Sequence, residues 1–321
     1  MHFPQLAAFS GNADIIRVIG HRGARGIMPE NTIEGFAFTL DCGVTLLEFD
    51  VSVTRDGVPV ITHNNHLTKS IVRDKDGNWL RGIEPKVSDL DWSDLAQLDV
   101  GGLDGLSEYG QRFPDQAFLY NARIPRLHDL CALISTPDHQ DVHLMLELKS
   151  DPEKLEDAKG RAADVAAVVA VVRDMQLTDR TIMHSFDWGL LAECKRLAPE
   201  MPTSFLTKLP NNSSDAGEDQ ATNASPDLTA ANVCVPDLVA QTGGGLWCPH
   251  YLDVTEETVA RAQQLGLGVA VWTVNEPKDI DQMIALNVDA IVSDYPGRVQ
   301  RRLLNHGLTW SSQSVTNKPS N

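Results

Sequence analysis

The chain has 321 residues, of which 42% are hydrophobic, and a formal net charge of −17 at pH 7. This length suits two average domains or one large α/β domain, and the apolar fraction is enough for a sizeable core. The acidic balance argues against nucleic acid as a partner, since that binding depends on clustered Lys and Arg.

No stretch approaches the ~20 consecutive apolar residues of a transmembrane helix, so no stable membrane insertion is expected. Residues 1–12 lack the basic start and the long apolar run of a secretory signal, which favours a cytoplasmic protein. The cysteines are odd in number and widely spaced, and we expect free, mostly buried thiols. They are Cys42, Cys131, Cys194, Cys234 and Cys248.

The first predicted strand, Arg17–Gly20, is followed directly by His21 and Arg22. A histidine at a strand end can transfer protons near neutral pH. The planar fork of an arginine suits a phosphate group. Taken alone, the pair is also explained by a capping histidine and a surface arginine.

The first predicted helix, Thr32–Asp41, begins within the sequence P-E-N-T. Either Asn31 or Thr32 can act as its N-cap, and Glu34 lies three residues beyond Asn31, as in a capping box. This structural role is enough to explain the motif. A position of Glu30 facing the site is the second possibility.

The second predicted strand, Val44–Asp50, carries Glu48 and Asp50 two residues apart. Strand periodicity places both carboxylates on the same side. Buried bare charges are costly, and a hard divalent cation with oxygen ligands removes that cost. A carboxylate pair held by Arg or Lys is the alternative.

The apolar run Val58–Thr62 follows closely on the strand of Glu48 and Asp50, and the connection contains only Thr54-Arg55-Asp56-Gly57 after Val53. A parallel crossover needs a dozen or more residues, so these two strands must form a hairpin, and Asp-Gly is a strong hairpin turn. The chain therefore returns His63 to the side of Asp50. Residues 64–123 then form a predicted insertion subdomain over one side of the strand ends.

The predicted strand Val142–Leu148 ends in E-L-K, which puts Glu147 and Lys149 on one side. Glu147 would supply a third carboxylate for the metal, and Lys149 a second cation for a phosphate. A simple ion pair at a strand end is the alternative. His184 also lies near the end of a predicted strand. A lone histidine in such a place is more often a polar residue with satisfied hydrogen bonds than a catalyst.

Eight short β-branched runs alternate with helical patterns, which predicts a TIM (β/α)8 barrel with a small insertion after the second strand. The predicted barrel domain spans residues 17–300, with terminal extensions at 1–16 and 307–321. Segment 209–245 is predicted to be either a lid or disordered, and the tail after His306 to be disordered. The other predicted strands are Thr181–Ser185, Thr203–Leu206, Leu246–Cys248, Gly268–Thr273 and Ala290–Ser293. The other predicted helices are Arg126–Ile134, Lys154–Asp174, Trp188–Leu197, Thr255–Leu265 and Pro277–Leu286.

Trp272 lies at the end of the seventh of these strands, in V-W-T-V-N. It can form a wall of the substrate pocket or belong to the core, and the sequence leaves both readings open. His66, His143 and His250 lie in no such cluster and are interpreted as structural or surface residues.

Together these motifs resemble the glycerophosphodiester phosphodiesterase family over roughly residues 17–300. The first block is specific by itself, and several blocks in order are very specific. The matching blocks are H-R-G-x5-P-E-N-T (21–32), E-x-D (48–50), T-x-D-G-x-x-V-x-x-H (54–63), Y-G-Q-R-F-P-D-Q (109–116), I-P-R-L (124–127), E-L-K (147–149), W-T-V-N (272–275) and S-D-Y-P (293–296).

The resemblance implies a TIM barrel that uses one divalent cation, Mg²⁺ or Ca²⁺, to hydrolyse glycerophosphodiesters to glycerol 3-phosphate and an alcohol. By motif position, the metal carboxylates correspond to Glu48, Asp50 and Glu147, the acid–base histidines to His21 and His63, and the phosphate-binding cations to Arg22 and Lys149.

One position departs from the family pattern, because His-Asp is usual where this chain has His63-Asn64. If that residue only orients the histidine, Asn64 can do so through its side-chain oxygen, but without charge. The imidazolium of His63 is then less stabilised and more acidic. This departure concerns how strong a base His63 is, and it leaves the assignment of His63 as an acid–base histidine unchanged.

Two rival functions remain compatible with the same motifs. A lysophospholipase D-like enzyme needs an apolar channel or a membrane-facing surface, whereas this chain shows no basic amphipathic helix and its acidity opposes binding to anionic membranes. A non-catalytic barrel that binds phosphodiesters is the second rival, and the presence of both histidines and all three carboxylates argues against it.

Overall fold

The computed structural model describes residues 3–155, 157–209, 226–229 and 233–311. Its centre is a closed barrel of eight parallel strands, and Ile19 of β1 closes it by pairing with Leu46 on one side and Val292 on the other. The predicted (β/α)8 barrel is therefore confirmed. Its strands are β1 (Arg17–His21), β2 (Leu46–Val53), β4 (His143–Leu148), β5 (Thr181–Ser185), β6 (Thr203–Thr207), β7 (Leu246–Pro249), β8 (Gly268–Val271) and β9 (Ala290–Ser293).

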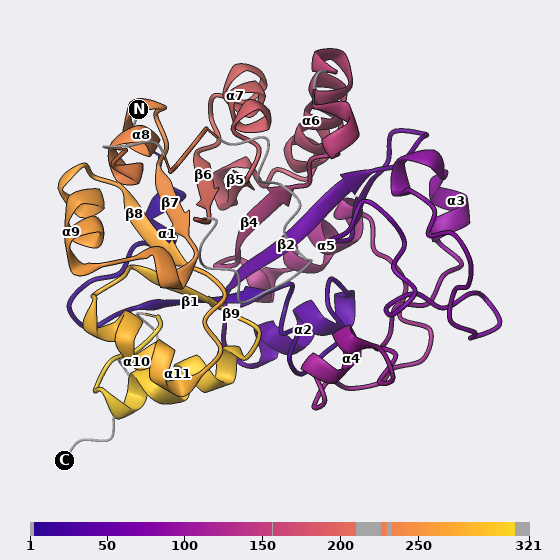
Figure 1. Cartoon of the computed structure of the whole chain (residues 1–321), viewed down its shortest axis with the longest axis horizontal. Helices are drawn as coiled ribbons and strands as arrows, with labels where there is room; N and C mark the ends of the chain where they lie inside the picture. The colour runs from indigo at the N-terminus through magenta and orange to yellow at the C-terminus, as the bar shows by residue number, and fades with distance from the viewer. Residues whose placement is uncertain (1–2, 156, 210–225, 230–232, 312–321) are drawn as a thin grey trace.

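Helices connect the strands and surround the barrel (Figure 1). Their apolar faces pack on the outward side chains of the strands, as in other α/β barrels. The predicted helices are all present, but the helix predicted from Lys154 begins four residues later, at Ala158, while the other ends differ by at most one residue. The barrel helices are α2 (Ile33–Asp41), α5 (Leu127–Ile134), α6 (Ala158–Asp174), α7 (Trp188–Leu197), α8 (Val235–Gln241), α9 (Glu256–Gln264), α10 (Pro277–Ala285) and α11 (Pro296–Asn305).

Helix α8 corrects the prediction of a lid or disorder for 209–245 at the C-terminal end of that segment. It has only seven residues, with Pro236 in its first turn, where a missing N–H is not costly. Val239 is fully buried and anchors the helix. Such a short helix after a long polar run gives little periodic signal. Residues 210–225 and 230–232 of the segment lie outside the described residues.

The strands sort their side chains by alternation, which explains where the site forms. On β2, Leu47, Phe49 and Val51 point outward to the helices, while Leu46 faces the barrel interior. Glu48 and Asp50 have the same parity as Leu46, so they also face inward, but higher along the strand. The interior is thus apolar at the amino ends of the strands and acidic at their carboxyl ends.

The amino end of the barrel is closed by the N-terminal extension. Helix α1 (Leu6–Phe9) places Phe9, which is fully buried, against inward-facing residues that include Ile19 and Met145. The side-chain amide of Gln5 donates to the carbonyl oxygens of Thr178 and Glu200, each at 3.0 Å. The extension therefore belongs to the core of the barrel.

The tail after His306 is ordered at its start, so the prediction of disorder is wrong for residues 307–311. The backbone N–H of Thr309 donates to the carbonyl of Asp14 at 2.9 Å, and the indole N–H of Trp310 donates to the carbonyl of Gly43 at 2.8 Å. The first contact ties the C-terminal segment to the N-terminal extension, and the second ties it to the loop after α2. Residues 312–321 lie outside the described part of the chain.

The predicted hairpin is confirmed. Strand β3 (Pro59–Ile61) is antiparallel to β2, with Val51 opposite Ile61. Gly57 has a φ of +80°, the left-handed conformation that the turn requires and glycine accepts readily. Beyond β3, the N–H of Thr62 donates to the carbonyl of Asp50 at 3.0 Å. This pairing brings His63 beside the carboxyl end of β2.

The insertion between β3 and α5 contains η1 (Val87–Asp89), α3 (Trp92–Leu95) and α4 (Glu108–Arg112) and lies on one side of the barrel, at the right in Figure 1. Its segments share a small hydrophobic core of their own. A buried ion pair between Arg73 and Asp99, at 2.9 Å, lies beside that core. The core residues are Val60, Leu67, Val72, Val87, Leu95, Val100 and Ile124.

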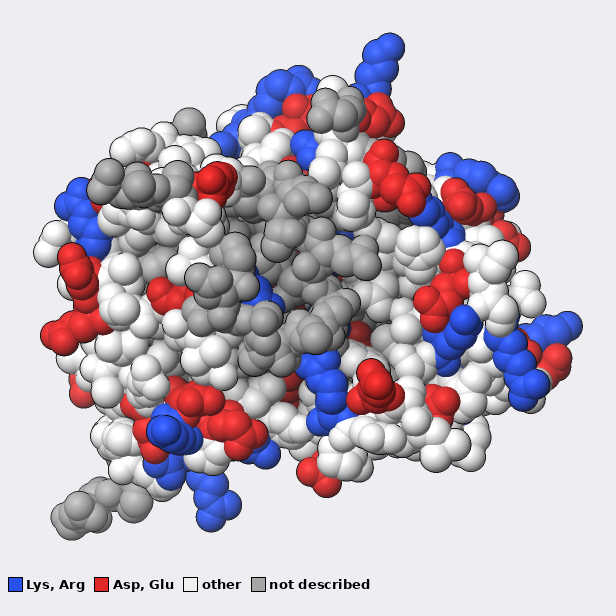
Figure 2. Space-filling view, in the orientation of Figure 1, with Lys and Arg blue, Asp and Glu red and all other residues white. Residues whose placement is uncertain are grey.

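Among the described residues, the structure contains no helix with the length and apolar character needed to cross a membrane. All five cysteines are free thiols, as predicted, and Cys131, Cys194 and Cys248 are buried. On the face shown in Figure 2, basic and acidic side chains are interspersed around the rim.

Candidate active site

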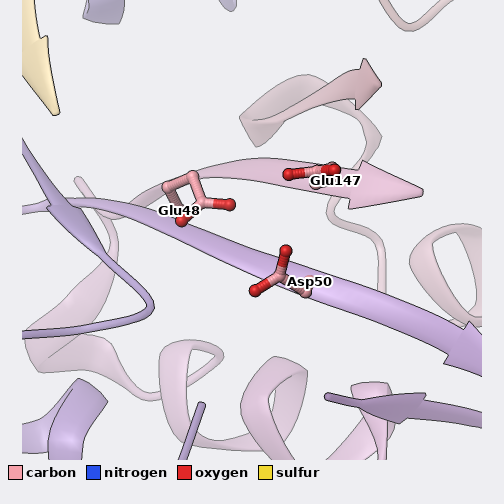
Figure 3. A group of neighbouring side chains, drawn as sticks. All are labelled: Glu48, Asp50 and Glu147. Atoms are coloured by element: carbon pink, nitrogen blue, oxygen red, sulfur yellow. The ribbon is translucent and has the colours of Figure 1, made fainter. Parts of the chain in front are cut away.

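Three carboxylates meet inside the carboxyl end of the barrel. Glu48 and Asp50 come from β2 and Glu147 from β4, and Figure 3 shows the three side chains converging. The strand register places Asp50 directly beside Glu147. All three side chains are buried, and each offers an oxygen atom within 4.8 Å of the others. Such an oxygen-only donor set suits a hard divalent cation.

The electrostatics of this cluster show that its negative charge is only partly compensated by protein groups. Burial, together with the charges of Asp50 and Glu147, raises the pKa of Glu48 well above its ordinary value. Burial raises the pKa of Glu147 to about 7, although Lys149 opposes the shift. Burial would also raise the pKa of Asp50, but His63, Lys149 and Arg22 outweigh it and hold that pKa well below its ordinary value.

Arg22 connects the first strand to the carboxylates. Its backbone has a positive φ of 50°, which turns the N–H toward Glu48 Oε2, at 3.0 Å. Its guanidinium lies between Glu30 Oε1, at 3.0 Å, and Asp50 Oδ2, at 3.2 Å. Burial lowers the pKa of Arg22, but the nearby acidic groups more than offset this and raise it overall, so the side chain is a fixed positive charge.

Lys149 also lies among the carboxylates. Its ammonium donates to Glu147 Oε1 at 2.7 Å and is 3.4 Å from Asp50 Oδ1. The two acidic neighbours raise its pKa in spite of burial. Lys149 therefore stays charged beside the two carboxylates.

His21 is held by a carboxylate that the sequence analysis did not single out. Its Nδ1 is 2.6 Å from Asp294 Oδ1, while Nε2 faces Glu48 Oε2 at 3.8 Å. Burial lowers the pKa of His21, although Asp294 opposes this. Asp294 belongs to the S-D-Y-P motif after β9, and its adjacency to His21 follows from β1–β9 pairing, which was the signal available in the sequence.

His63 is held in a different way. Its Nδ1 is 2.8 Å from the side-chain oxygen of Asn64, whose amide donates to Thr68 at 2.6 Å. Asn64 thus orients the ring through an uncharged group, as its position in the sequence suggested. The two histidines have different supports, a carboxylate for His21 and an amide for His63.

Two further residues of the site were missed in the sequence. Arg25 donates to Asp294 Oδ1 from Nε at 2.8 Å and to Oδ2 from a terminal nitrogen at 3.0 Å, and its guanidinium stacks on Phe113 at 4.6 Å. Tyr109, from α4 of the insertion, donates its hydroxyl to Glu30 and accepts from Arg22 at 3.4 Å and Arg25 at 3.3 Å. The insertion therefore contacts the site directly, because its Tyr109 binds both Arg22 and Arg25.

The P-E-N-T motif has both the structural and the site role that the sequence left open. Thr32 is the N-cap of α2 and accepts from the N–H of Gly35 at 3.0 Å. Asn31 instead donates its side-chain amide to Asp50 Oδ2 at 2.9 Å, and Glu30 pairs with Arg22. The capping box with Glu34 does not form, because Asn31 is turned toward the barrel.

These groups surround a cleft of about 460 Å³, lined by His21, Arg22, Arg25, Glu48, His63, Glu147, His184, Phe186, Leu206, Trp272, Thr273 and Val292. Trp272 forms part of its apolar wall, edge-on to Phe186 at 5.3 Å, and donates its indole N–H to the carbonyl of Cys248 at 3.0 Å. His184 is buried, Nδ1 lies 2.8 Å from Ser204 Oγ, and burial lowers its pKa to about 3. It is a neutral, satisfied polar residue.

The charge of the described site fits one divalent cation. Arg22, Arg25 and Lys149 oppose five carboxylates, those of Glu30, Glu48, Asp50, Glu147 and Asp294. When every carboxylate is counted as ionised and the histidines are left out of the count, two negative charges remain. One divalent ion at the carboxylate cluster balances them, and the raised pKa values of two cluster members reflect the same excess.

Comparison with known proteins gives a consistent result. Residues 21–298 match the model of the glycerophosphoryl diester phosphodiesterase family. A crystal structure from Silicibacter pomeroyi DSS-3, described provisionally as a glycerophosphoryl diester phosphodiesterase, is 52% identical, covers 97% of this chain and 100% of its own, and superposes with a TM-score of 0.90. A glycerophosphodiester phosphodiesterase of Caldanaerobacter subterraneus subsp. tengcongensis is 25% identical over 279 residues, or 87% of this chain and 94% of that protein.

A phosphodiesterase of Oleispira antarctica, solved with the product sn-glycerol 3-phosphate, shares the fold at a TM-score of 0.65 and 23% identity, over 90% of this chain and 97% of its own. The family match spans most of the described barrel, from His21 at the end of β1 to Arg298 within α11. The chain therefore belongs to the glycerophosphoryl diester phosphodiesterase family.

Proposed function

We propose that this protein hydrolyses glycerophosphodiesters to glycerol 3-phosphate and an alcohol, with one bound Mg²⁺ or Ca²⁺ ion. Membership of a family of phosphoric diester hydrolases supports the reaction class. The observation that carries the metal-dependent mechanism is the buried cluster of Glu48, Asp50 and Glu147. Two of its members, Glu48 and Glu147, line one cleft with His21 and His63.

The three carboxylates would hold the cation, and Asn31 and Arg22 would fix Asp50 and Glu48 in place by hydrogen bonds. A divalent ion at this site supplies positive charge that offsets the charge of the phosphodiester and of its transition state. Arg22, with Lys149, adds fixed positive charge next to the cluster. In a largely buried cleft these charges are worth more than at the surface.

The two histidines would carry the protons. One takes a proton from the attacking oxygen, and the other gives a proton to the leaving alcohol. Asp294 holds the ring of His21 so that Nε2 faces the cleft, and Asn64 holds the ring of His63. The attacking oxygen can be the substrate's own glycerol hydroxyl. Its attack releases the alcohol and forms a cyclic glycerol phosphate, and water then opens this ring.

Trp272 would form the wall against which the carbon skeleton of the substrate lies. Its ring is fixed by the hydrogen bond to Cys248 and by the edge contact with Phe186, so the wall is preformed. An apolar surface opposite a cluster of charged groups orients a substrate that has an anionic centre and a carbon arm.

The test of this proposal is product identification by ³¹P NMR. Glycerophosphocholine incubated with the enzyme and Mg²⁺ or Ca²⁺ is expected to give glycerol 3-phosphate and choline. Lysophosphatidylcholine, assayed in parallel, separates this activity from that of a lysophospholipase D. Faster turnover of the lysophospholipid contradicts the proposed substrate class, and failure to release any phosphomonoester across a diester panel contradicts the proposed reaction.

A further inference from the structure

A second cavity, of about 360 Å³, adjoins the cleft on the other side of His63. His63 lines both spaces. The barrel provides one wall of the second cavity, through Asn31 and Thr62, and the insertion provides the other, through residues such as Ile71 and Val100. A diester whose phosphorus lies at the carboxylate cluster can therefore extend one arm past His63 into this space.

The wall of the second cavity offers hydrogen-bonding groups that are not used within the protein. The hydroxyl of Thr62 and the imidazole of His66 make no hydrogen bond to another described residue, whereas the amide of Asn64 is engaged by His63 and Thr68. A hydroxyl and an imidazole can each donate or accept. The cavity therefore presents two open polar sites to a bound molecule.

The remaining lining sets the chemical class of that molecule. Ile61, Val100 and Ile124 provide an apolar floor. Among the described lining residues there is no Lys, Arg, Phe, Tyr or Trp, so neither an anionic head group nor a quaternary ammonium finds its usual partner. The one carboxylate, that of Glu30, is already engaged by Arg22 and Tyr109.

We propose that this second cavity receives the leaving alcohol and fits a small uncharged polyol such as glycerol, in preference to choline. The inference rests on the proposed function, because the arm in the cavity is that of a phosphodiester bound at the carboxylate cluster. Glycerophosphoglycerol is then a better substrate than glycerophosphocholine. The insertion, which supplies half of the wall, determines that choice.

The experiment compares three diesters at a saturating concentration of metal. Glycerophosphoglycerol and glycerophosphocholine differ in the arm that enters the cavity, and glycerophosphomethanol has an arm too short to reach its far wall. The quantity measured is the ratio of kcat/KM for each of the first two diesters to that for glycerophosphomethanol, which cancels effects on the chemistry at phosphorus.

Thr62→Val keeps the shape of the side chain and removes its hydroxyl. It is expected to lower the ratio for glycerophosphoglycerol about tenfold, as loss of a buried hydrogen bond does, and to change the ratio for glycerophosphocholine less. Ile71→Trp, which fills the cavity, is expected to lower both ratios. Ile83→Trp is the matched control, since Ile83 is on the same insertion, 92% exposed and outside the lining.

The outcomes are distinguishable. Wild-type turnover of all three diesters without a preference for the polyol, or equal ratios in Thr62→Val and wild type, overturns the subsite while leaving the proposed function intact. A matching loss in Ile83→Trp also overturns it, because the effect then comes from the insertion as a whole. Absence of turnover with every diester instead contradicts the proposed function itself.

Discussion

At the scale of single residues, the two histidines of the cleft differ in what supports them. Asp294 places a carboxylate on Nδ1 of His21, and Asn64 places an uncharged amide on Nδ1 of His63. In both cases the support leaves Nε2 as the nitrogen available to a substrate. The proposed mechanism assigns the two proton transfers to this pair.

Replacing either histidine by alanine is expected to lower kcat by at least ~10²-fold, because a positioned proton donor or acceptor typically contributes ~10²–10⁴-fold. The measurement is release of glycerol 3-phosphate from a glycerophosphodiester at saturating substrate and metal. A thermal melt close to that of the wild type shows that the fold is retained. Full activity in His21→Ala removes that residue from the mechanism.

Asp294→Asn is expected to lower kcat by roughly 10²–10⁴-fold with a smaller change in KM, since an amide can donate to Nδ1 and so stabilise the wrong tautomer of His21. The matched control is Asp289→Asn, a carboxylate that accepts from the N–H groups of Gly11 and Val269 and is remote from the cleft. The control is expected to lose stability without losing kcat. Equal loss of kcat in both variants contradicts a positioning role.

At the scale of elements, β2 and β4 set the chemistry by alternation. Each strand runs from an apolar inward residue, Leu46 or Met145, to an inward carboxylate at its carboxyl end. The register of the two neighbouring strands brings three carboxylates together, and Arg22 and Lys149 offset only part of their negative charge. The metal-free protein therefore holds protons where the loaded protein would hold an ion.

The apparent affinity for Mg²⁺ or Ca²⁺ is expected to fall as the pH drops from about 8 to about 6. Glu147, whose pKa is raised to about 7, then takes up a proton that competes with the ion, and Glu48 is shifted in the same direction. Titration calorimetry in two buffers of different ionisation enthalpy measures the protons released on binding. An affinity that does not change over this range contradicts the competition.

The same raised pKa values affect stability, with a defined sign. Groups whose pKa is higher in the folded state contribute stability that is complete below their unfolded pKa, ~4.3 for Glu, and is lost as the pH rises through the folded value. The metal-free protein is thus expected to lose stability between about pH 5 and pH 8. Added metal should raise Tm more at pH 8 than at pH 6.

The sequence predicts features that depend on neighbouring residues better than contacts between residues that are far apart in the chain. The eight strands and the β2–β3 hairpin come from local periodicity and from an Asp-Gly turn, and both are confirmed. Asp294 and Tyr109 lie in the motif blocks 293–296 and 109–116, but their roles were missed because each acts on a residue far away in the chain, His21 or Glu30. Helix α8 was missed because a short helix has almost no periodicity.

At the scale of the whole molecule, the ends of the chain complete the barrel. Phe9 and Gln5 close its amino end, and Thr309 ties the C-terminal segment to the same region. We propose that residues 17–300, with the insertion 64–123, form one domain, and that these terminal contacts belong to its folding unit. The candidate active site therefore lies at the carboxyl ends of the strands, and the terminal segments cover the opposite, amino end.

Phe9→Ala is expected to destabilise the protein by ~3–5 kcal/mol, the usual cost of deleting a buried phenylalanine, while kcat per folded molecule is retained. Calorimetry checks this and the single-domain proposal together, because one transition should move to lower temperature as a whole. Two transitions, of which only one moves, contradict a common folding unit.

The central claim is that the carboxylate cluster works by holding a divalent cation, and removal of metal tests it most directly. Enzyme treated with EDTA and then freed of the chelator is expected to release no glycerol 3-phosphate from a glycerophosphodiester, and to recover its activity on addition of Mg²⁺ or Ca²⁺. Unchanged hydrolysis by the metal-free protein contradicts the account, because Glu48, Asp50 and Glu147 would then have no part in the reaction.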